Sequence, residues 1–269
     1  MSRGNQADEI RFDEPQGRGS EPPGDRLRRI LVVAVTVVVT AVVVAVALRV
    51  EYALVVSPPE DPGPQRIHPA VQVRSGGGHY AFSDTFRGEP VTYSPCTPIR
   101  ILVNDARMPR RAHGLVEDAV DRVVAATGLD LRVAGRTDAT PRAMRSLRFA
   151  GPEVRPAPVL LAWTTPRHER ALAGDPTGVG RSVASAGSGR PRLVTGAVSL
   201  DAPALAGFLT LPGGRALVRA VVMRELAHLV GLDDVRDPAE LMNRDNVGLA
   251  DFGPGDREGL ALLGRGGCA

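Results

Sequence analysis

One long apolar run and several short apolar segments divide this chain. The run covers residues 30–48, where only Thr36 and Thr40 interrupt aliphatic side chains. A helix rises ~1.5 Å per residue, so a run of this length crosses the ~30 Å hydrocarbon core of a bilayer. We therefore predict a transmembrane helix over residues 27–50, in contact with the membrane through residues 30–48.

Arginines flank the apolar run unequally. Arg26, Arg28 and Arg29 precede it, whereas only Arg49 follows closely. Positive charge is retained on the cytoplasmic side, so we expect a single-pass protein of the cell membrane with a cytoplasmic N-terminus and an extracytoplasmic C-terminal part. The alternative is a cleaved signal peptide, because residues 45–47 (AVA) resemble a small-x-small cleavage site.

The segments on either side of the run lack a pattern that could bury a core. Residues 1–26 mix charged residues with Gly and Pro, which predicts a disordered tail. Residues 51–75 include a proline-rich stretch that is typical of a semi-rigid spacer. The remaining residues, 76–269, are expected to form one globular domain.

Short apolar segments of two periodicities alternate within residues 76–269. Helical spacing is found over residues 115–127, 215–230 and 256–263. Short aliphatic runs predict strands over residues 99–103, 129–133, 158–163 and 193–200, the last with a glycine bulge. The predicted fold class is α+β.

Charge and cysteine content narrow the classes of function. The 33 basic residues are all arginine and are nearly balanced by 30 acidic residues, and aromatic residues make up only 4% of the chain. A nucleic-acid surface needs clustered cations with stacking rings, so we expect no nucleic-acid partner. Cys96 and Cys268 stand near the two ends of the domain, which suits a disulfide outside the cytoplasm; two unrelated buried thiols are the alternative.

Three polar residues interrupt the predicted helix 215–230. This helix is apolar almost all the way round, which is typical of a helix through the middle of a domain. Arg224, Glu225 and His228 nevertheless stand near its end, at spacings that share a face. Burying unpartnered charge is costly, so these groups need one another or a ligand. We therefore expect a functional site there.

The residues around this site carry a resemblance to a known family. Residues 224–234 (RELAHLVGLDD) resemble the metzincin signature H-E-x-x-H-x-x-G-x-x-H, and Met242 stands where that family has its Met-turn. Residues 231–242 (GLDDVRDPAELM) are similar to matrixin-like zinc metallopeptidases of actinobacteria. The resemblance covers roughly residues 90 to 269. It implies a zincin-like domain, a mixed twisted sheet with a central active-site helix.

The resemblance also assigns roles to single residues. It implies a catalytic zinc, Glu225 as the general base, His228 and Asp234 as metal ligands, and hydrolysis of peptide or protein substrates. An aspartate is an ordinary zinc ligand, so Asp234 at the third ligand position is tolerable. Arg224 at the first ligand position is not, because a guanidinium has no lone pair for a metal and stays protonated.

The central hypothesis is that the Arg224 guanidinium takes over the electrostatic role of the metal, through charge-assisted bonds to Asp234 and also Glu225. The alternative places Arg224 in solvent at the end of the helix. Three functions follow: a pseudoprotease that binds a peptide or an envelope partner, an active zinc peptidase with a recruited ligand, and a structural envelope module. The histidines available for recruitment are His68, His79, His113 and His168.

Overall fold

A computed structural model describes residues 23–56, 64–73, 76–141, 157–185, 189–245 and 248–268. The chain divides into two compact units, Met1–Pro62 and Gly63–Ala269. Most of the predicted tail, residues 1–22, lies outside the described residues, as do residues 57–63 of the predicted spacer.

The described part of the first unit, residues 23–56, forms helix α1 (Pro23–Val56). Residues Leu27–Arg49 of α1 are long and apolar enough to cross a membrane, and none of that stretch is buried within the protein. The valine-rich sequence forms a helix here because no glycine or proline interrupts residues 25–56. A membrane span and a signal sequence are both compatible with this helix.

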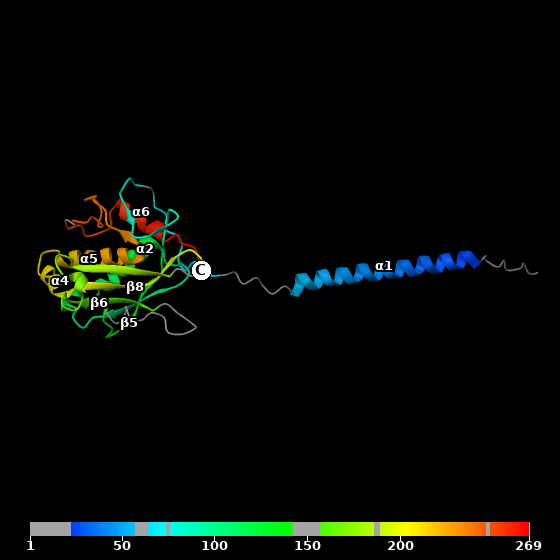
Figure 1. The fold of residues 1–269 in the computed structure, drawn as a ribbon, viewed down its shortest axis with the longest axis horizontal. Helices are drawn as coiled ribbons and strands as arrows, with labels where there is room; N and C mark the ends of the chain where they lie inside the picture. Colours follow the sequence, from blue (N-terminus) through cyan, green and yellow to red (C-terminus); the bar gives the residue numbers. More distant parts are fainter. Residues whose placement is uncertain are drawn as a thin grey trace, which may run out of the picture. The chain divides into compact units, whose positions relative to one another are not determined.

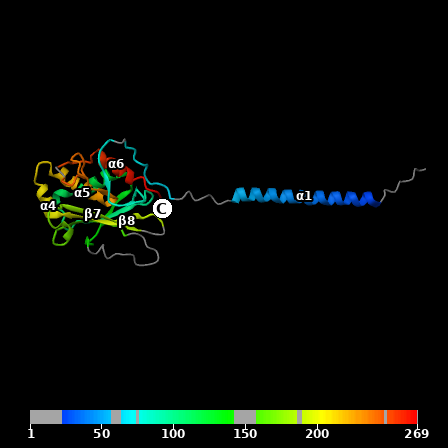
Figure 2. The ribbon, with the colours of Figure 1, turned by 45° about the horizontal axis from the view of Figure 1, so that its top comes forward.

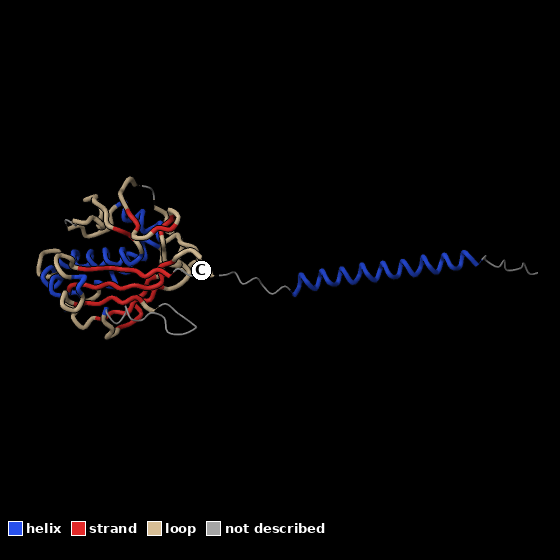
Figure 3. Tube along the Cα trace, in the orientation of Figure 1, coloured by secondary structure: helices blue, strands red, loops and turns tan. Residues whose placement is uncertain are grey.

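The second unit is a mixed α/β domain built on a five-stranded sheet, shown in Figures 1 and 3. The strand order is β5-β4-β6-β8-β7, and only the β7–β8 pair is antiparallel. The strands are β4 (Ile99–Asn104), β5 (Leu131–Arg136), β6 (Val159–Thr164), β7 (Gly178–Ser185) and β8 (Arg192–Asp201). β6 is buried along its whole length, as its continuous apolar run predicts for a central parallel strand.

Helices cover one face of this sheet. Helix α5 packs against β7 and β8, and α2 packs against β5, α5 and α6 (Figure 2). These helices are α2 (Leu115–Thr127), α4 (Ala202–Phe208), α5 (Gly214–Val230) and α6 (Pro254–Leu263), with 3-10 turns η1 (Arg110–Ala112) and η2 (Arg170–Leu172). The core lies between the sheet and α2 and α5.

Short pairings and a disulfide tie the ends of the domain together. Two-residue strands pair as β1 (Ala81–Phe82) with β9 (Leu232–Asp233) and as β2 (Thr85–Phe86) with β3 (Glu89–Pro90). The predicted disulfide between Cys96 and Cys268 is formed.

Residues 64–73, which the sequence assigns to the spacer, belong to the second unit. The backbone N–H of Ile67 donates to the carbonyl of Pro95 at 3.1 Å, and the Arg66 Nη1 donates to the carbonyl of Gly264 at 2.9 Å. The second unit therefore starts at Gly63.

The predicted strands and helices occur near their expected positions, but the sheet holds one more strand, β7, which the sequence analysis missed. The predicted bulge in β8 lies beside Val194, where the pairing shifts from Thr195 to Leu193, and not at Gly196. Gly196 serves another purpose, because a Cβ there would lie 2.5 Å from the Leu229 Cδ1 of α5. The glycine lets the helix approach the sheet.

Candidate functional site

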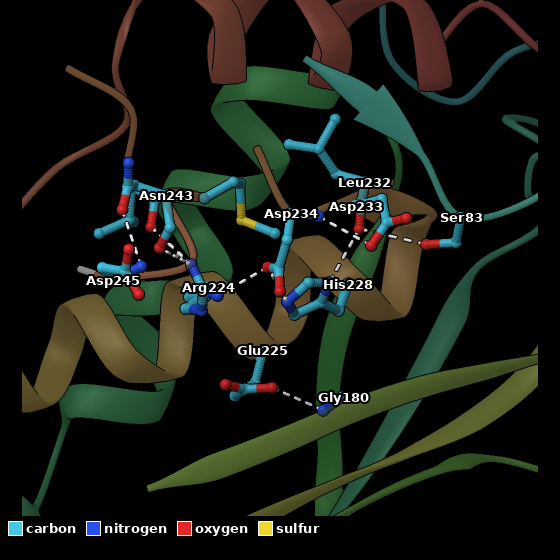
Figure 4. Close-up of polar contacts among 12 residues, drawn as sticks. Ser83, Gly180, Arg224, Glu225, His228, Leu232, Asp233, Asp234, Asn243 and Asp245 are labelled. Atoms are coloured by element: carbon cyan, nitrogen blue, oxygen red, sulfur yellow. Dashed lines mark hydrogen bonds and ion pairs between the residues drawn. The ribbon is translucent and has the colours of Figure 1, made fainter. Parts of the chain in front are cut away.

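The end of α5 and the turn after it bring three polar side chains together, those of Arg224, His228 and Asp234 (Figure 4). Arg224 and His228 are one helical turn apart and share a face. Gly231 ends the helix with φ of 112°, a conformation that glycine adopts without strain. The chain then turns back, so that Asp234 meets the helix it has just left.

Asp234 joins the two basic side chains through a single oxygen. Its Oδ1 accepts a hydrogen bond from the Arg224 Nη2 at 2.6 Å and lies 3.1 Å from the His228 Nε2. The other ring nitrogen of His228, Nδ1, lies 2.9 Å from the carbonyl oxygen of Leu232, which fixes the plane of the imidazole. The predicted ion pair between Arg224 and Asp234 is thus present.

Arg224 is partly buried and its guanidinium is directed into the protein rather than to solvent. Its side chain is 14% exposed, and its Nη1 donates to the carbonyl oxygens of Leu241 at 2.9 Å and Asn243 at 2.8 Å. The surface alternative is therefore wrong. The guanidinium holds the 241–243 turn, which contains the fully buried Met242, against α5.

Two buried carboxylates hold the same turn from the other side. Asp256 accepts hydrogen bonds from the backbone N–H groups of Leu241 at 2.5 Å and Met242 at 3.3 Å. Glu240 in turn accepts from the N–H groups of Gly255 and Asp256 at the start of α6. Burial raises the pKa of Asp256 to about 6, against the opposing effect of these backbone donors. The turn is therefore clamped between α5 and α6.

Glu225 points away from this network, toward the sheet. Its Oε2 accepts a hydrogen bond from the backbone N–H of Gly180 in β7 at 2.6 Å, and the residue is 5% exposed. The expected bond between Arg224 and Glu225 is not found among the hydrogen bonds and ion pairs of the described residues; Glu225 has a backbone partner instead.

Burial and neighbouring charges have opposing effects on the pKa values of Glu225, His228 and Asp234. Burial raises the pKa of Glu225, while nearby His228 and Arg224 oppose the rise. Burial on its own would lower the pKa of His228, but the hydrogen bond to Asp234 and the charge of Glu225 raise it above its usual value. For Asp234, the bond from His228 and the charge of Arg224 outweigh burial and lower the pKa.

These side chains line one wall of a cavity of about 700 Å³. Gly178, Val179 and Gly180 of β7 form part of its boundary. Its apolar part is contributed by α4, α5 and the loops that follow them: Phe208, Leu211, Leu217, Val221 and Leu249. An extended strand edge, an apolar recess and a charged wall therefore meet in one place.

The donor set does not fit the zinc that the resemblance implies. Of the three motif positions, only His228 and Asp234 offer lone pairs; the two contact each other, and Asp234 also bonds Arg224. A catalytic zinc usually has three protein ligands. A fixed guanidinium bonded to the carboxylate would also repel a divalent cation.

The other histidines do not complete the set. None of the four lines the cavity described above. The His79 Nδ1 lies 2.7 Å from the Asp237 Oδ2, and the His168 Nδ1 lies 2.8 Å from the Thr165 Oγ1. The His68 Nε2 lies 3.6 Å from the Asp130 Oδ1. The carbonyl of His113 accepts a hydrogen bond from Arg215. In the described residues, no group of three or more His, Cys, Asp or Glu side chains is arranged to hold a metal ion.

The sequence analysis missed several residues that shape the site. Gly178 and Gly180 lie under Glu225, where a Cβ at Gly178 would be 2.6 Å from the Glu225 Cγ and one at Gly180 would overlap the Glu225 carbonyl oxygen. The spacing Gly-Val-Gly after a loop was a usable signal, since glycine in a strand marks a close backbone approach. Glu240 and Asp256 carried no comparable signal.

No protein-family model matches this chain, and no curated protein matches it.

Proposed function

We propose that this chain is a membrane-anchored, metzincin-like pseudoprotease, whose extracytoplasmic domain binds an extended segment of a peptide or envelope protein without hydrolysing it. The observation that carries the proposal is the position of the Arg224 guanidinium. It stands where the metzincin pattern has its first zinc ligand, and it is bonded to Asp234, which stands at the third.

The charges of the site support a metal-free arrangement. Arg224 supplies a permanent positive charge beside Asp234, which a metal would supply in the peptidases that the motif resembles. The same guanidinium also bonds the carbonyls of Leu241 and Asn243, so its loss would remove a donor from both carbonyls and from Asp234. Arg224 therefore has a structural role at this position.

The outer edge of β7 supports the proposal that the ligand is an extended peptide segment. Among the described strands, β7 pairs only with β8, so no strand occupies its other edge. A peptide that adds a strand to such an edge gains affinity from main-chain hydrogen bonds, and a recess beside the edge supplies specificity. The cavity walled by Phe208, Leu217 and Val221 is such a recess.

The anchor and its orientation are part of the proposal. Leu27–Arg49 is apolar throughout its interior, and Arg28 and Arg29 lie at its N-terminal end. The Cys96–Cys268 disulfide suits an oxidising compartment outside the cytoplasm. Intact mass measurement of membrane-extracted protein tests the anchor, and loss of the N-terminal helix would identify a cleaved signal sequence instead.

The test of function uses the full chain in detergent micelles. Two unfolded probes, β-casein and carboxymethylated α-lactalbumin, are assayed for binding by biolayer interferometry and for cleavage, and bound zinc is measured by mass spectrometry. We expect binding without cleavage and no stoichiometric zinc. Zinc at one ion per chain with chelator-sensitive cleavage would overturn the proposal in favour of an active peptidase. The absence of binding and cleavage would overturn it in favour of a structural module.

Arg224→His is the informative variant. It restores two histidines one helical turn apart, with Asp234 in reach as a third ligand, so it should gain zinc and gain or raise peptidase activity. The matched control is Arg257→His on the exposed side of α6, which should gain neither. If Arg224→His bound no more zinc than the control, Arg224 would not be what keeps the metal out.

A further inference from the structure

The free edge of β7 is already partly occupied by a side chain of the protein. The backbone N–H of Asp201 donates to the carbonyl of Thr177, which identifies this residue pair as a hydrogen-bonded one. In an antiparallel ladder, hydrogen-bonded pairs alternate with pairs that are not hydrogen-bonded. The backbone groups of Gly178, Gly180 and Ser182 therefore point away from β8. The outward N–H of Gly180 is the group that donates to Glu225 (Figure 4).

The contact is close and shielded from water. Gly178 and Gly180 have no side chains, and this lets α5 approach until the Glu225 side chain lies directly on the strand. The carboxylate is 5% exposed and its Oε2 is 2.6 Å from the Gly180 nitrogen. A buried donor that loses its acceptor keeps the full cost of its desolvation. The edge donor at Gly180 is therefore held firmly.

We infer that Glu225 is an internal competitor for the edge of β7: its carboxylate stands in for the carbonyl oxygen of a docked peptide. This inference rests on the proposed function. A peptide whose backbone pairs at Gly180 has to displace the carboxylate first, and its apparent affinity is reduced by the fraction of molecules in which the edge is closed. Arg224 and His228 line the same cavity, and the Arg224 guanidinium provides a permanent cation beside the released carboxylate.

The inference gives Glu225 a task that differs from proton transfer. A general base has to reach a water molecule beside the substrate, whereas a competitor has to reach the strand edge, as it does here. Among the described residues, the neighbouring outward positions Gly178 and Ser182 have no corresponding side-chain cap. Glu225 thus controls the middle one of three consecutive outward positions.

Two substitutions separate these roles. Glu225→Gln keeps an amide oxygen that accepts from the Gly180 N–H, whereas Glu225→Ala removes the acceptor. The first experiment needs no ligand and measures amide hydrogen exchange of Gly180 in the full chain, labelled with ¹⁵N-glycine in detergent micelles. We expect exchange to accelerate by about tenfold in Glu225→Ala, and not in Glu225→Gln. Equal protection in Glu225→Ala and wild type would overturn the inference.

The second experiment measures affinity for β-casein. Glu225→Ala should bind about tenfold more tightly than wild type, and Glu225→Gln should show no gain. The fluorescence of the buried Trp163 checks that each variant is folded. If Glu225→Ala is folded but binds no better than wild type, the inference fails while the proposed function stands. If no form binds β-casein or carboxymethylated α-lactalbumin, the proposed function fails, and the exchange data still report whether Glu225 caps the strand.

Discussion

Replacing Arg224 with methionine tests whether the guanidinium is structural at this place. Methionine keeps an unbranched stem of similar length but removes the charge and every donor. Three acceptors then lose their partner: the Asp234 Oδ1, the carbonyl of Leu241 and the carbonyl of Asn243. The change therefore removes the link between α5, the strand after it and the 241–243 turn.

The partial burial of the Arg224–Asp234 ion pair determines how much stability the substitution is expected to remove. The Arg224 and Asp234 side chains are 14% and 24% exposed, so solvent screens the pair only in part. Removing one partner of a buried ion pair costs about 3–5 kcal/mol. A surface pair costs ~0–1 kcal/mol. His228 still contacts Asp234 after the change, so we expect a loss near about 3 kcal/mol, the lower end of the first range.

Urea unfolding of the full chain in detergent micelles measures the loss. Trp163, the single tryptophan, is 1% exposed in β6 and reports unfolding of the core by fluorescence. Arg257→Met, on an exposed position of α6, is the matched control and should leave the midpoint unchanged. If Arg224→Met cost no more than the control, the electrostatic role assigned to Arg224 would be refuted.

The double variant Arg224→Met with Asp234→Leu sharpens the result. It removes both charges, so it leaves no uncompensated carboxylate at the site. We expect it to be more stable than Arg224→Met with Asp234 retained, and comparison of the double variant with both single variants, Asp234→Leu included, measures the coupling between the two side chains. Additive losses would mean that the two residues act independently.

Two further predictions concern the sheet contact and the pH dependence. Gly180→Ala should destabilise the fold by about 1–3 kcal/mol, because its Cβ would overlap the backbone of Glu225. The control Gly207→Ala has open space around the new Cβ and should not destabilise the fold. Equal unfolding midpoints for the two variants would contradict the packing argument. The pKa of His228 is raised on folding, so its contribution is complete below the unfolded pKa and disappears as the pH rises through the folded one. Wild type should therefore lose stability relative to His228→Gln as the pH rises above the ordinary histidine pKa, and a pH-independent difference would show that His228 does not titrate there.

The elements of the domain were largely predictable from local pattern. The runs over residues 99–103 and 158–163 become β4 and β6, and the helical spacing over residues 215–230 becomes α5. These segments are apolar enough that burial determines their structure. β7 was missed because its residues (GVGRSVAS) are mostly small or polar, half of them are exposed and none is buried, so no apolar alternation marks it.

The partners of the site residues were predictable only in part. The spacing of Arg224 and His228 follows from helical geometry, and the glycine at 231 indicates a turn that returns toward the helix. The pairing of Arg224 with Asp234 follows from charge. Nothing local, however, indicates that the carbonyls of Leu241 and Asn243 also bind Arg224, because that turn is positioned by Asp256, which lies in α6.

The sequence by itself determined the apolar N-terminal helix, the alternation of strands and helices, the two cysteines that pair, and a charged cluster whose arginine has no electron pair for a metal. These properties depend on residue chemistry and short-range periodicity. Only the tertiary structure decided the direction of Glu225, since its partner at Gly180 is brought to it by packing a helix on a strand 45 residues earlier in the chain. A carboxylate with several donors in reach accepts from the one that the fold places nearest, and sequence spacing does not encode that distance.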